Sequence, residues 1–158
     1  MDRLMTAATF LAALGSGLMA GLFFAFSTSV MSALGRISPP AGISAMQSVN
    51  VTILNPVFFA VFFGTALLSV VLIVGALAGR SDMSMIALLA GSVLYLAGCM
   101  AVTMVFNVPL NNALAAVAAE SAEGTAIWSR YLAEWVPWNH VRTVACLASC
   151  AAFIQALR

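Results

Sequence analysis

The chain contains a run of 31 residues, from Leu4 to Leu34, without a charged side chain, and this run limits its possible folds more than any other feature of the sequence. The apolar core of a secretory signal peptide is only about 7–15 residues long. A helix that crosses the roughly 30 Å hydrocarbon core of a bilayer needs about 20 residues. Of the 158 residues, 63% are hydrophobic and 7% are charged, whereas soluble domains contain about 25% charged residues. The sequence therefore predicts an integral membrane protein.

Three further apolar segments follow the first one and predict an all-α, polytopic membrane protein. The predicted spans cover residues 4–34, 56–78, 83–106 and 138–157. The stretch 41–54 has a helical pattern but carries polar side chains. The Asn55-Pro56 pair favours either a cap at the start of a new helix or a kink in one continuous helix. We expect residues 1–158 to form a single domain, a bundle of four transmembrane helices.

The segment before the last predicted span is amphipathic. Trp128, Tyr131, Trp135 and Trp138 are three or four residues apart and form one edge of a helix. Tryptophan and tyrosine are enriched at the boundary between membrane and water, so we predict an interfacial helical segment that leads into the last span. A cap packed over the end of the bundle is the alternative interpretation.

Polar residues are expected to gather at one membrane face. With four spans, both termini and the turn at Arg80 lie on one side, and the polar segments lie on the other. That other side receives Gln47, Asn50, Asn55, Asn107, Asn111, Asn112, Trp135, Trp138, Asn139, His140 and Arg142. Three arginines fall on each side, so the positive-inside rule does not separate the two orientations. Burial of Arg142 in the bundle would favour cytoplasmic termini.

A stripe of small residues runs along the first span and includes Ala13, Gly17 and Gly21 at intervals of four. Helices in lipid associate through close packing of small residues. The stripe therefore predicts contact with a neighbouring helix of the same chain, and we expect a leucine at Gly21 to disturb the bundle. A homo-oligomer that pairs through Gly17 and Gly21 is the alternative.

Several classes of function are disfavoured by what the sequence lacks. Cys99, Cys146 and Cys150 lie in apolar segments without the ligand spacing of a zinc site, and His140 is the only histidine. The predicted spans contain no carboxylate, no Gly-rich nucleotide motif and no serine-centred nucleophile elbow. The net charge of +1 is not concentrated in a basic patch, which argues against nucleic-acid binding. We predict neither a metal site nor a bound cofactor.

The polar residues are spaced so that several of them share helical faces. Asn107 and Asn111 are four residues apart, and Trp135, Asn139 and Arg142 are separated by four and three. Polar groups at membrane depth must pair with one another or line a wet cavity. These residues predict either a pocket for a flat aromatic molecule with polar edges or a purely structural polar cap. An arginine that extends to lipid headgroups is a further alternative for Arg142.

Two segments carry a resemblance to a known family: Asn107-Val-Pro-Leu-Asn111 and Trp135-Val-Pro-Trp138-Asn139-His-Val-Arg142-Thr. There the chain resembles the anthrone-oxygenase-like membrane proteins, and Gly21-Leu-Phe-Phe-Ala-Phe-Ser27 and the segment from Met46 to Pro56 agree with it. The resemblance implies four membrane helices and a bacterial inner-membrane location. It also implies oxygenation of an anthrone to an anthraquinone, without an identified metal or flavin. Asn107, Pro109, Asn111, Trp138, Asn139 and Arg142 occupy its motif positions.

We therefore expect a cofactor-independent oxygenase that acts on a lipophilic phenolic or polycyclic aromatic substrate. In this hypothesis His140 is the base and Arg142 stabilises the developing oxyanion. The expected substrate-binding residues are Gln47, Asn50, Asn55, Asn107, Asn111, Trp135, Trp138 and Asn139. The alternative is a non-enzymatic membrane module that binds a lipid, a quinone or a partner subunit. A small transporter is a third, less favoured class, because four short helices make a narrow bundle.

Overall fold

The computed structural model describes residues 3–158, which form helices and short turns and contain no strand. Three π-helical turns, labelled η, interrupt two of the helices, so the chain is organised as five continuous helices. The elements are α1 (Arg3–Ala25), η1 (Phe26–Val30), α2 (Met31–Leu34), α3 (Pro39–Thr52), α4 (Pro56–Leu77), α5 (Met85–Val93), η2 (Leu94–Ala101), η3 (Thr103–Asn107), α6 (Val108–Ala115) and α7 (Ala122–Ala156).

Three of these helices are long and apolar enough to cross a membrane: Arg3–Leu34, Pro56–Leu77 and Met85–Ala115. The fourth predicted span lies in α7, which does not meet the same criterion within residues 3–158. Asn139, His140 and Arg142 lower the hydropathy of that helix. Asn139 and Arg142 are buried against other helices. A mean hydropathy over all faces of the helix does not distinguish such buried polar side chains from exposed ones.

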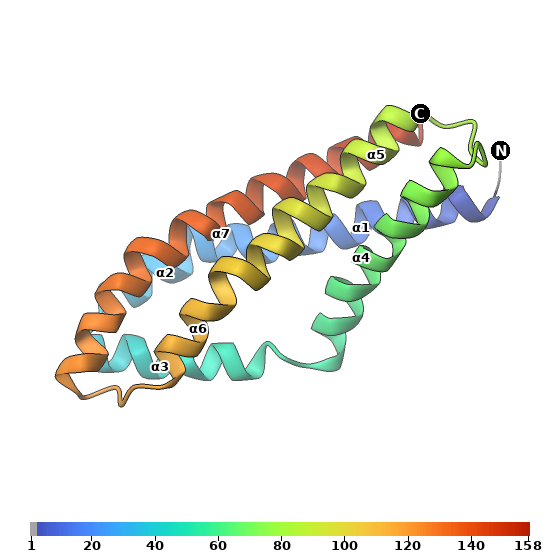
Figure 1. The fold of residues 1–158 in the computed structure, drawn as a ribbon. Coiled ribbons are helices and arrows are strands. Elements are labelled where there is room, and N and C mark those ends of the chain that lie inside the picture. Colours follow the sequence, from blue (N-terminus) through green and yellow to red (C-terminus); the bar gives the residue numbers. More distant parts are fainter. Residues whose placement is uncertain (1–2) are drawn as a thin grey trace.

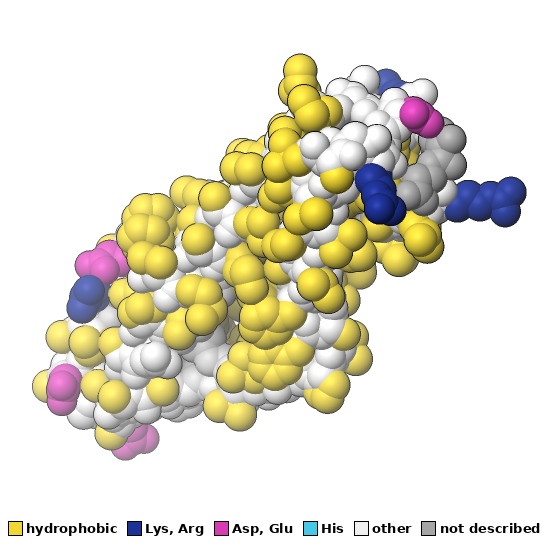
Figure 2. Space-filling view, turned by 45° about the vertical axis from the view of Figure 1, so that its right-hand side comes forward, with side chains coloured by type: hydrophobic (Ala, Val, Ile, Leu, Met, Phe, Trp, Pro, Cys, Tyr) yellow, Lys and Arg dark blue, Asp and Glu magenta, His cyan; other side chains and the backbone are white. Residues whose placement is uncertain are grey.

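The helices form an elongated bundle (Figure 1). α7 packs along α1 and α5, and α4 packs against α1 and α5 near the chain ends. The start of α1, the end of α7 and the turn between α4 and α5 lie together at one end. Helix α3 crosses the opposite end. Charged side chains lie at the two ends of a broad hydrophobic surface (Figure 2).

Helix α4 begins at a cap, which decides between the two interpretations of the Asn55-Pro56 pair. Asn55 is extended, with φ −115° and ψ 163°, and its Oδ1 accepts a hydrogen bond of 3.0 Å from the Phe58 N–H. Pro56 occupies the first helical position, where its missing N–H is not needed. Helices α3 and α4 are therefore separate, and a single kinked helix is not formed.

At Pro109, unlike at Pro56, the chain does not start a separate helix. The helix continues through Pro109 to Ala115. Proline cannot donate a backbone hydrogen bond and displaces the preceding turn. The turn before it widens into η3, and the Val108 N–H bonds to the Thr103 carbonyl five residues earlier. The helix of the predicted third span, residues 83–106, therefore continues through the following polar segment toward α3.

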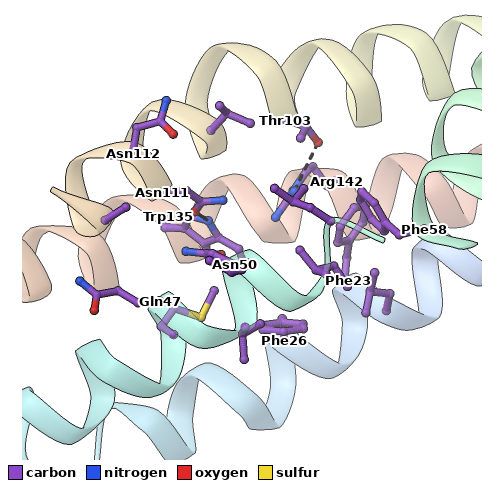
Figure 3. A pocket seen from close by; sticks show the side chains of 18 residues that line it. Phe23, Phe26, Gln47, Asn50, Phe58, Thr103, Asn111, Asn112, Trp135 and Arg142 are labelled. Carbon is purple, nitrogen blue, oxygen red and sulfur yellow. Dashed lines mark hydrogen bonds between the residues drawn. The ribbon is translucent and has the colours of Figure 1, made fainter. Parts of the chain in front are cut away.

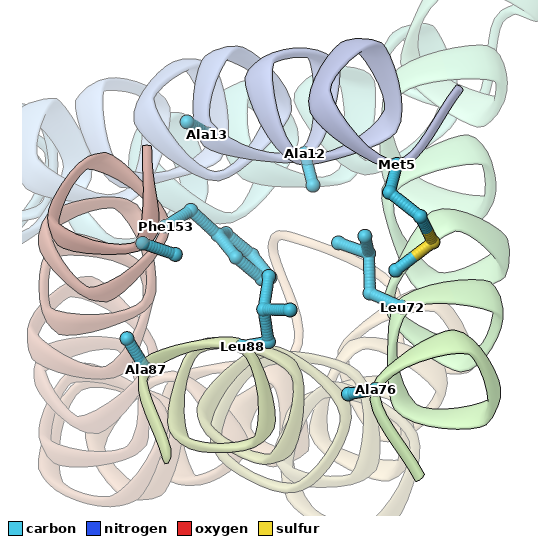
Figure 4. Packing of buried hydrophobic residues seen from close by; sticks show 9 residues of the cluster. Met5, Ala12, Ala13, Leu72, Ala76, Ala87, Leu88 and Phe153 are labelled. Atoms are coloured by element: carbon cyan, nitrogen blue, oxygen red, sulfur yellow. The ribbon is translucent and has the colours of Figure 1, made fainter. Parts of the chain in front are cut away.

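Buried side chains fill the bundle in three successive clusters. Near the chain ends, Phe153 of α7 and Leu88 of α5 point toward one another at the centre of the helices (Figure 4). The close packing of α5 against α7 there depends on Gly91, which is not part of the predicted stripe: a Cβ at Gly91 would lie 2.8 Å from the Phe153 ring. A Cβ at Gly21 would meet nothing within 4 Å. The prediction that a leucine at Gly21 disturbs the bundle is therefore wrong, since this face is open.

The aromatic edge of α7 lies inside the molecule and does not face the headgroups. Trp128, Tyr131 and Trp135 are 3%, 1% and 5% exposed, and they pack against residues of α3 and α6. Tyr131 stacks between the other two, with ring centroids 5.7 and 5.6 Å away. The first half of α7, α3 and α6 thus form a cap over the end of the bundle, which was the alternative interpretation of this segment.

Candidate functional site

A pocket of about 440 Å³ lies where the cap meets the bundle (Figure 3). Its volume falls within the range of about 300–1,000 Å³ that is typical of small-molecule sites. Each of the five continuous helices contributes residues to its lining. The lining residues are Leu22, Phe23, Phe26, Met46, Gln47, Val49, Asn50, Val51, Ile53, Leu54, Phe58, Thr103, Val108, Asn111, Asn112, Ala115, Trp135 and Arg142.

Arg142 is the one charged side chain among these lining residues, and it is only 4% exposed. One of its terminal nitrogens, Nη2, donates to Asn139 Oδ1 at 2.7 Å, and Nη1 donates to Thr103 Oγ1 at 3.3 Å. The guanidinium carbon lies 4.1 Å from the centre of the Phe23 ring and 5.1 Å from that of Trp135. Arg142 therefore points into the pocket and does not reach toward lipid headgroups.

Asn139 holds Arg142 in place from the same face of α7. Its Nδ2 donates to the Phe23 carbonyl at 2.8 Å and to Ser27 Oγ at 2.7 Å, so it also ties α7 to the first helix. Asn139 is fully buried. With its amide nitrogen engaged in this way, the oxygen must face Arg142. Asn139 is thus a positioning residue behind the pocket wall.

Asn111 organises the opposite wall. Its Oδ1 accepts hydrogen bonds from the Tyr131 hydroxyl at 2.7 Å and from Trp135 Nε1 at 2.8 Å. Asn107, one turn earlier, is completely buried beneath the pocket and donates to the Trp135 carbonyl at 3.2 Å. These two asparagines fix the position of the Trp135 ring, which forms part of the pocket surface.

Gln47 and Asn50 reach the pocket from α3. Gln47 Nε2 donates to the carbonyls of Leu114 and Val117, at 2.8 and 3.0 Å, and so joins α3 to the end of α6. Asn50 lies beside the Tyr131 hydroxyl, but its buried Nδ2 has no hydrogen-bond partner of good geometry. Gln47 thus has structural partners, whereas the Asn50 Nδ2 donor is unpaired in the lining of the pocket.

Five predicted site residues do not line the pocket. Asn107 and Asn139 support its wall, as described above, whereas Asn55, Trp138 and His140 do not. Asn55 caps α4 and also donates to the Thr52 carbonyl at 3.1 Å. The Trp138 ring stacks on Phe106 with centroids 3.6 Å apart. His140 is exposed and does not line the pocket. Each residue turns an α-helix by about 100°, so the face that presents Asn139 and Arg142 to the interior turns His140 outward. The structure thus does not support His140 as the base of this site.

Sequence reasoning missed Phe23, Phe26 and Thr103, which line the pocket. The signal for Thr103 was present, because Thr103, Asn107 and Asn111 continue one period of four. The two phenylalanines gave no such signal, since an aromatic ring on an apolar helix faces lipid equally well.

Three buried polar atoms near the pocket have no hydrogen-bond partner: Asn50 Nδ2, Asn107 Oδ1 and Arg142 Nε. Unsatisfied buried groups are costly, at about 1–3 kcal/mol each and more for charged groups. No carboxylate lines the pocket, and among residues 3–158 no three His, Cys, Asp or Glu side chains could share a metal ion. The arrangement favours an aromatic occupant that brings an acceptor, or a negative charge, to Arg142.

Comparison with known proteins gives the family. The family model described as anthrone oxygenase matches residues 58–152, which is more than half of the chain. The chain belongs to the anthrone oxygenase family. This confirms the resemblance inferred from the Asn107–Asn111 and Trp135–Arg142 motifs. A search of the curated proteins finds no match to the chain, and neither does a search of the solved structures.

The part of the chain that matches the anthrone oxygenase family supplies Phe58 from α4, Thr103 and Asn111 from the third helix, and Trp135 and Arg142 from α7. The remaining lining residues come before the match, among them Phe23 and the α3 residues.

Proposed function

We propose that the protein crosses a bacterial inner membrane four times, with the second half of α7 as the fourth span and with cytoplasmic termini. Between His140 and Gln155, which are exposed near its two ends, the exposed large side chains of that half are apolar: Val141, Val144, Leu147 and Ile154. Its polar side chains Asn139 and Arg142 face other helices. Because Arg142 is buried, two arginines remain at the cap end and three at the terminal end, which favours the terminal end as the cytoplasmic side.

Cysteine labelling tests this topology. In a variant without native cysteines, Ser81→Cys places a thiol in the α4–α5 turn and Glu120→Cys places one just before α7. A membrane-impermeant maleimide added to intact spheroplasts should label the second position, whereas the first should need permeabilised membranes. Labelling of both positions from the same side would refute the four-span arrangement.

We propose further that the pocket oxygenates a lipophilic phenolic or polycyclic aromatic substrate of the anthrone type without a bound cofactor. The observation that carries this proposal is the buried guanidinium of Arg142, which faces an aromatic pocket with no carboxylate in its lining. A cation in a site of low dielectric stabilises a developing enolate far more than it would in water. Phe23 and Trp135, the rings nearest the guanidinium, provide flat apolar surfaces for the substrate.

The chemistry requires little else from the protein. Loss of a proton from the ring methylene of an anthrone gives an enolate, whose negative oxygen lies at Arg142. The enolate carbon reduces dioxygen and forms a hydroperoxide, which loses water to give the carbonyl, so CH₂ and O₂ become C=O and H₂O. No histidine or carboxylate lines the pocket. We therefore assign water as the acceptor of the methylene proton, at the open side of the pocket where Asn112 is exposed.

An assay in lipid nanodiscs tests the activity. The purified protein, supplied with anthrone, should consume one dioxygen per anthraquinone formed, faster than empty nanodiscs do. His140→Ala should leave this rate unchanged, because His140 lies outside the pocket. A rate equal to that of empty nanodiscs would overturn the oxygenase proposal. If the protein then still binds anthraquinone, the result supports the non-enzymatic binding module.

A further inference from the structure

An apolar groove runs along the outer side of α1 and α7 and shares only Leu22 with the lining of the pocket. It has a volume of about 840 Å³, and its lining includes Phe10, Leu14, Gly17 and Gly21 from α1 and Cys150 and Ile154 from α7. Gly21 has open space above it, and a Cβ at Gly17 would lie 3.5 Å from the Cys150 sulfur. Gly21 therefore forms an open floor of the groove, whereas Gly17 lies against Cys150 of the neighbouring helix α7.

The length of this groove corresponds to one leaflet of a bilayer. Phe10 and Gly21 are eleven residues apart, or about 16 Å at a rise of 1.5 Å per residue. That is half of the roughly 30 Å hydrocarbon core. An acyl chain of a phospholipid extends over the same depth, whereas a transmembrane helix would continue past both ends of the groove.

Two arginines lie at the end of the groove that is next to the chain ends. Arg158 is part of the groove lining. A shallower hollow lined by Arg3, Thr6 and Ala7 continues the groove, since both share Phe10 and Leu157. Figure 2 shows several dark-blue side chains and one magenta side chain at this end of the molecule, so basic groups predominate there. An apolar groove of leaflet depth thus ends at two guanidinium groups at the height of the lipid headgroups.

Charge decides between the two occupants that an apolar groove in a membrane could take. All copies of a membrane protein have the same orientation, so a second copy docked here would bring its own Arg3 and Arg158 to the same end. Four like charges would then repel one another. An anionic headgroup is instead attracted, and a phosphate accepts hydrogen bonds from arginine in a bidentate geometry. We propose that this groove binds an anionic phospholipid, with one acyl chain over Gly17 and Gly21 and the headgroup at Arg3 and Arg158.

Native mass spectrometry of the full chain, released from nanodiscs, tests this site with phosphatidylglycerol and phosphatidylcholine of identical acyl chains. One phosphatidylglycerol should be retained in preference to phosphatidylcholine. Arg3→Gln combined with Arg158→Gln should reduce that retention about tenfold or more, since each arginine near an anionic headgroup contributes about 1 kcal/mol. Gly21→Leu should also reduce retention, because the new side chain starts from an open position and extends into the groove.

Arg36→Gln is the matched control, because Arg36 is exposed and precedes α3 at the opposite end of the bundle. It should leave phosphatidylglycerol retention unchanged. Equal retention of the two lipids would overturn the proposal, as would unchanged retention in both groove variants. A dimer that disappears in Gly21→Leu would show that a second copy occupies the groove. None of these measurements depends on oxygenase activity.

Discussion

Arg142→Lys is expected to lower the rate of anthrone oxygenation by about 10²-fold although it keeps the positive charge, within the range for loss of one oxyanion donor. The planar guanidinium donates to Asn139 and Thr103 while its face lies over Phe23. An ammonium group lacks this planar fork and is more strongly hydrated. The lysine ammonium would bond to only one of the two acceptors, Asn139 or Thr103, and the positive charge would no longer extend to the other one. The comparison requires the turnover number and KM of both proteins in the same nanodiscs.

Two further variants separate charge from geometry in this experiment. Arg142→Met removes the charge at similar length and should lower the rate by about 10³-fold, the upper end of that range. Arg36→Lys changes an exposed arginine and should leave the rate unchanged. Quenching of tryptophan fluorescence by anthraquinone reports occupation of the pocket, because Trp135 lines it. If Arg142→Lys retains the full rate with native quenching, then Arg142 does not stabilise the transition state.

Asn139→Leu should lower the free energy of unfolding by about 2–3 kcal/mol. One interhelical hydrogen bond in a membrane protein contributes only about 0.6 kcal/mol on average. Here the substitution removes three hydrogen bonds, to Phe23, Ser27 and Arg142. It also leaves a buried guanidinium nitrogen without its closest acceptor, and unpaired buried charges are more costly than neutral groups. Unfolding in mixed detergent micelles, followed by circular dichroism, measures the difference.

The control for this substitution is Asn112→Leu, because Asn112 is an exposed asparagine at the edge of the same pocket. Its free energy of unfolding should stay within about 0.5 kcal/mol of the original, as for most surface substitutions. Asn139→Asp gives Arg142 a carboxylate partner. This partner should weaken the quenching of tryptophan fluorescence by anthraquinone, because it competes with the pocket's occupant for the guanidinium. Equal stability of Asn139→Leu and Asn112→Leu would show that Asn139 does not support the packing of α7 against α1.

Local sequence patterns were sufficient for part of the site. The period of four and three that links Trp135, Asn139 and Arg142 predicted a shared inward face, and the structure places all three at the pocket or directly behind its wall. The same reasoning could not reject His140. Adjacent residues on a helix point in directions about 100° apart, and which direction is interior depends on how the whole helix is rotated against its neighbours.

The membrane class, three of the spans and the gathering of polar residues at one end could be predicted from the amino-acid sequence, because they follow from hydropathy and from the alternation of antiparallel helices. Which face of each helix is covered depends on the packing of the helices against one another. Packing left Gly21 open, stacked Trp138 on Phe106 and buried Trp128 under α3. Such outcomes depend on side chains that are distant in sequence and adjacent only after packing, which a local pattern does not contain.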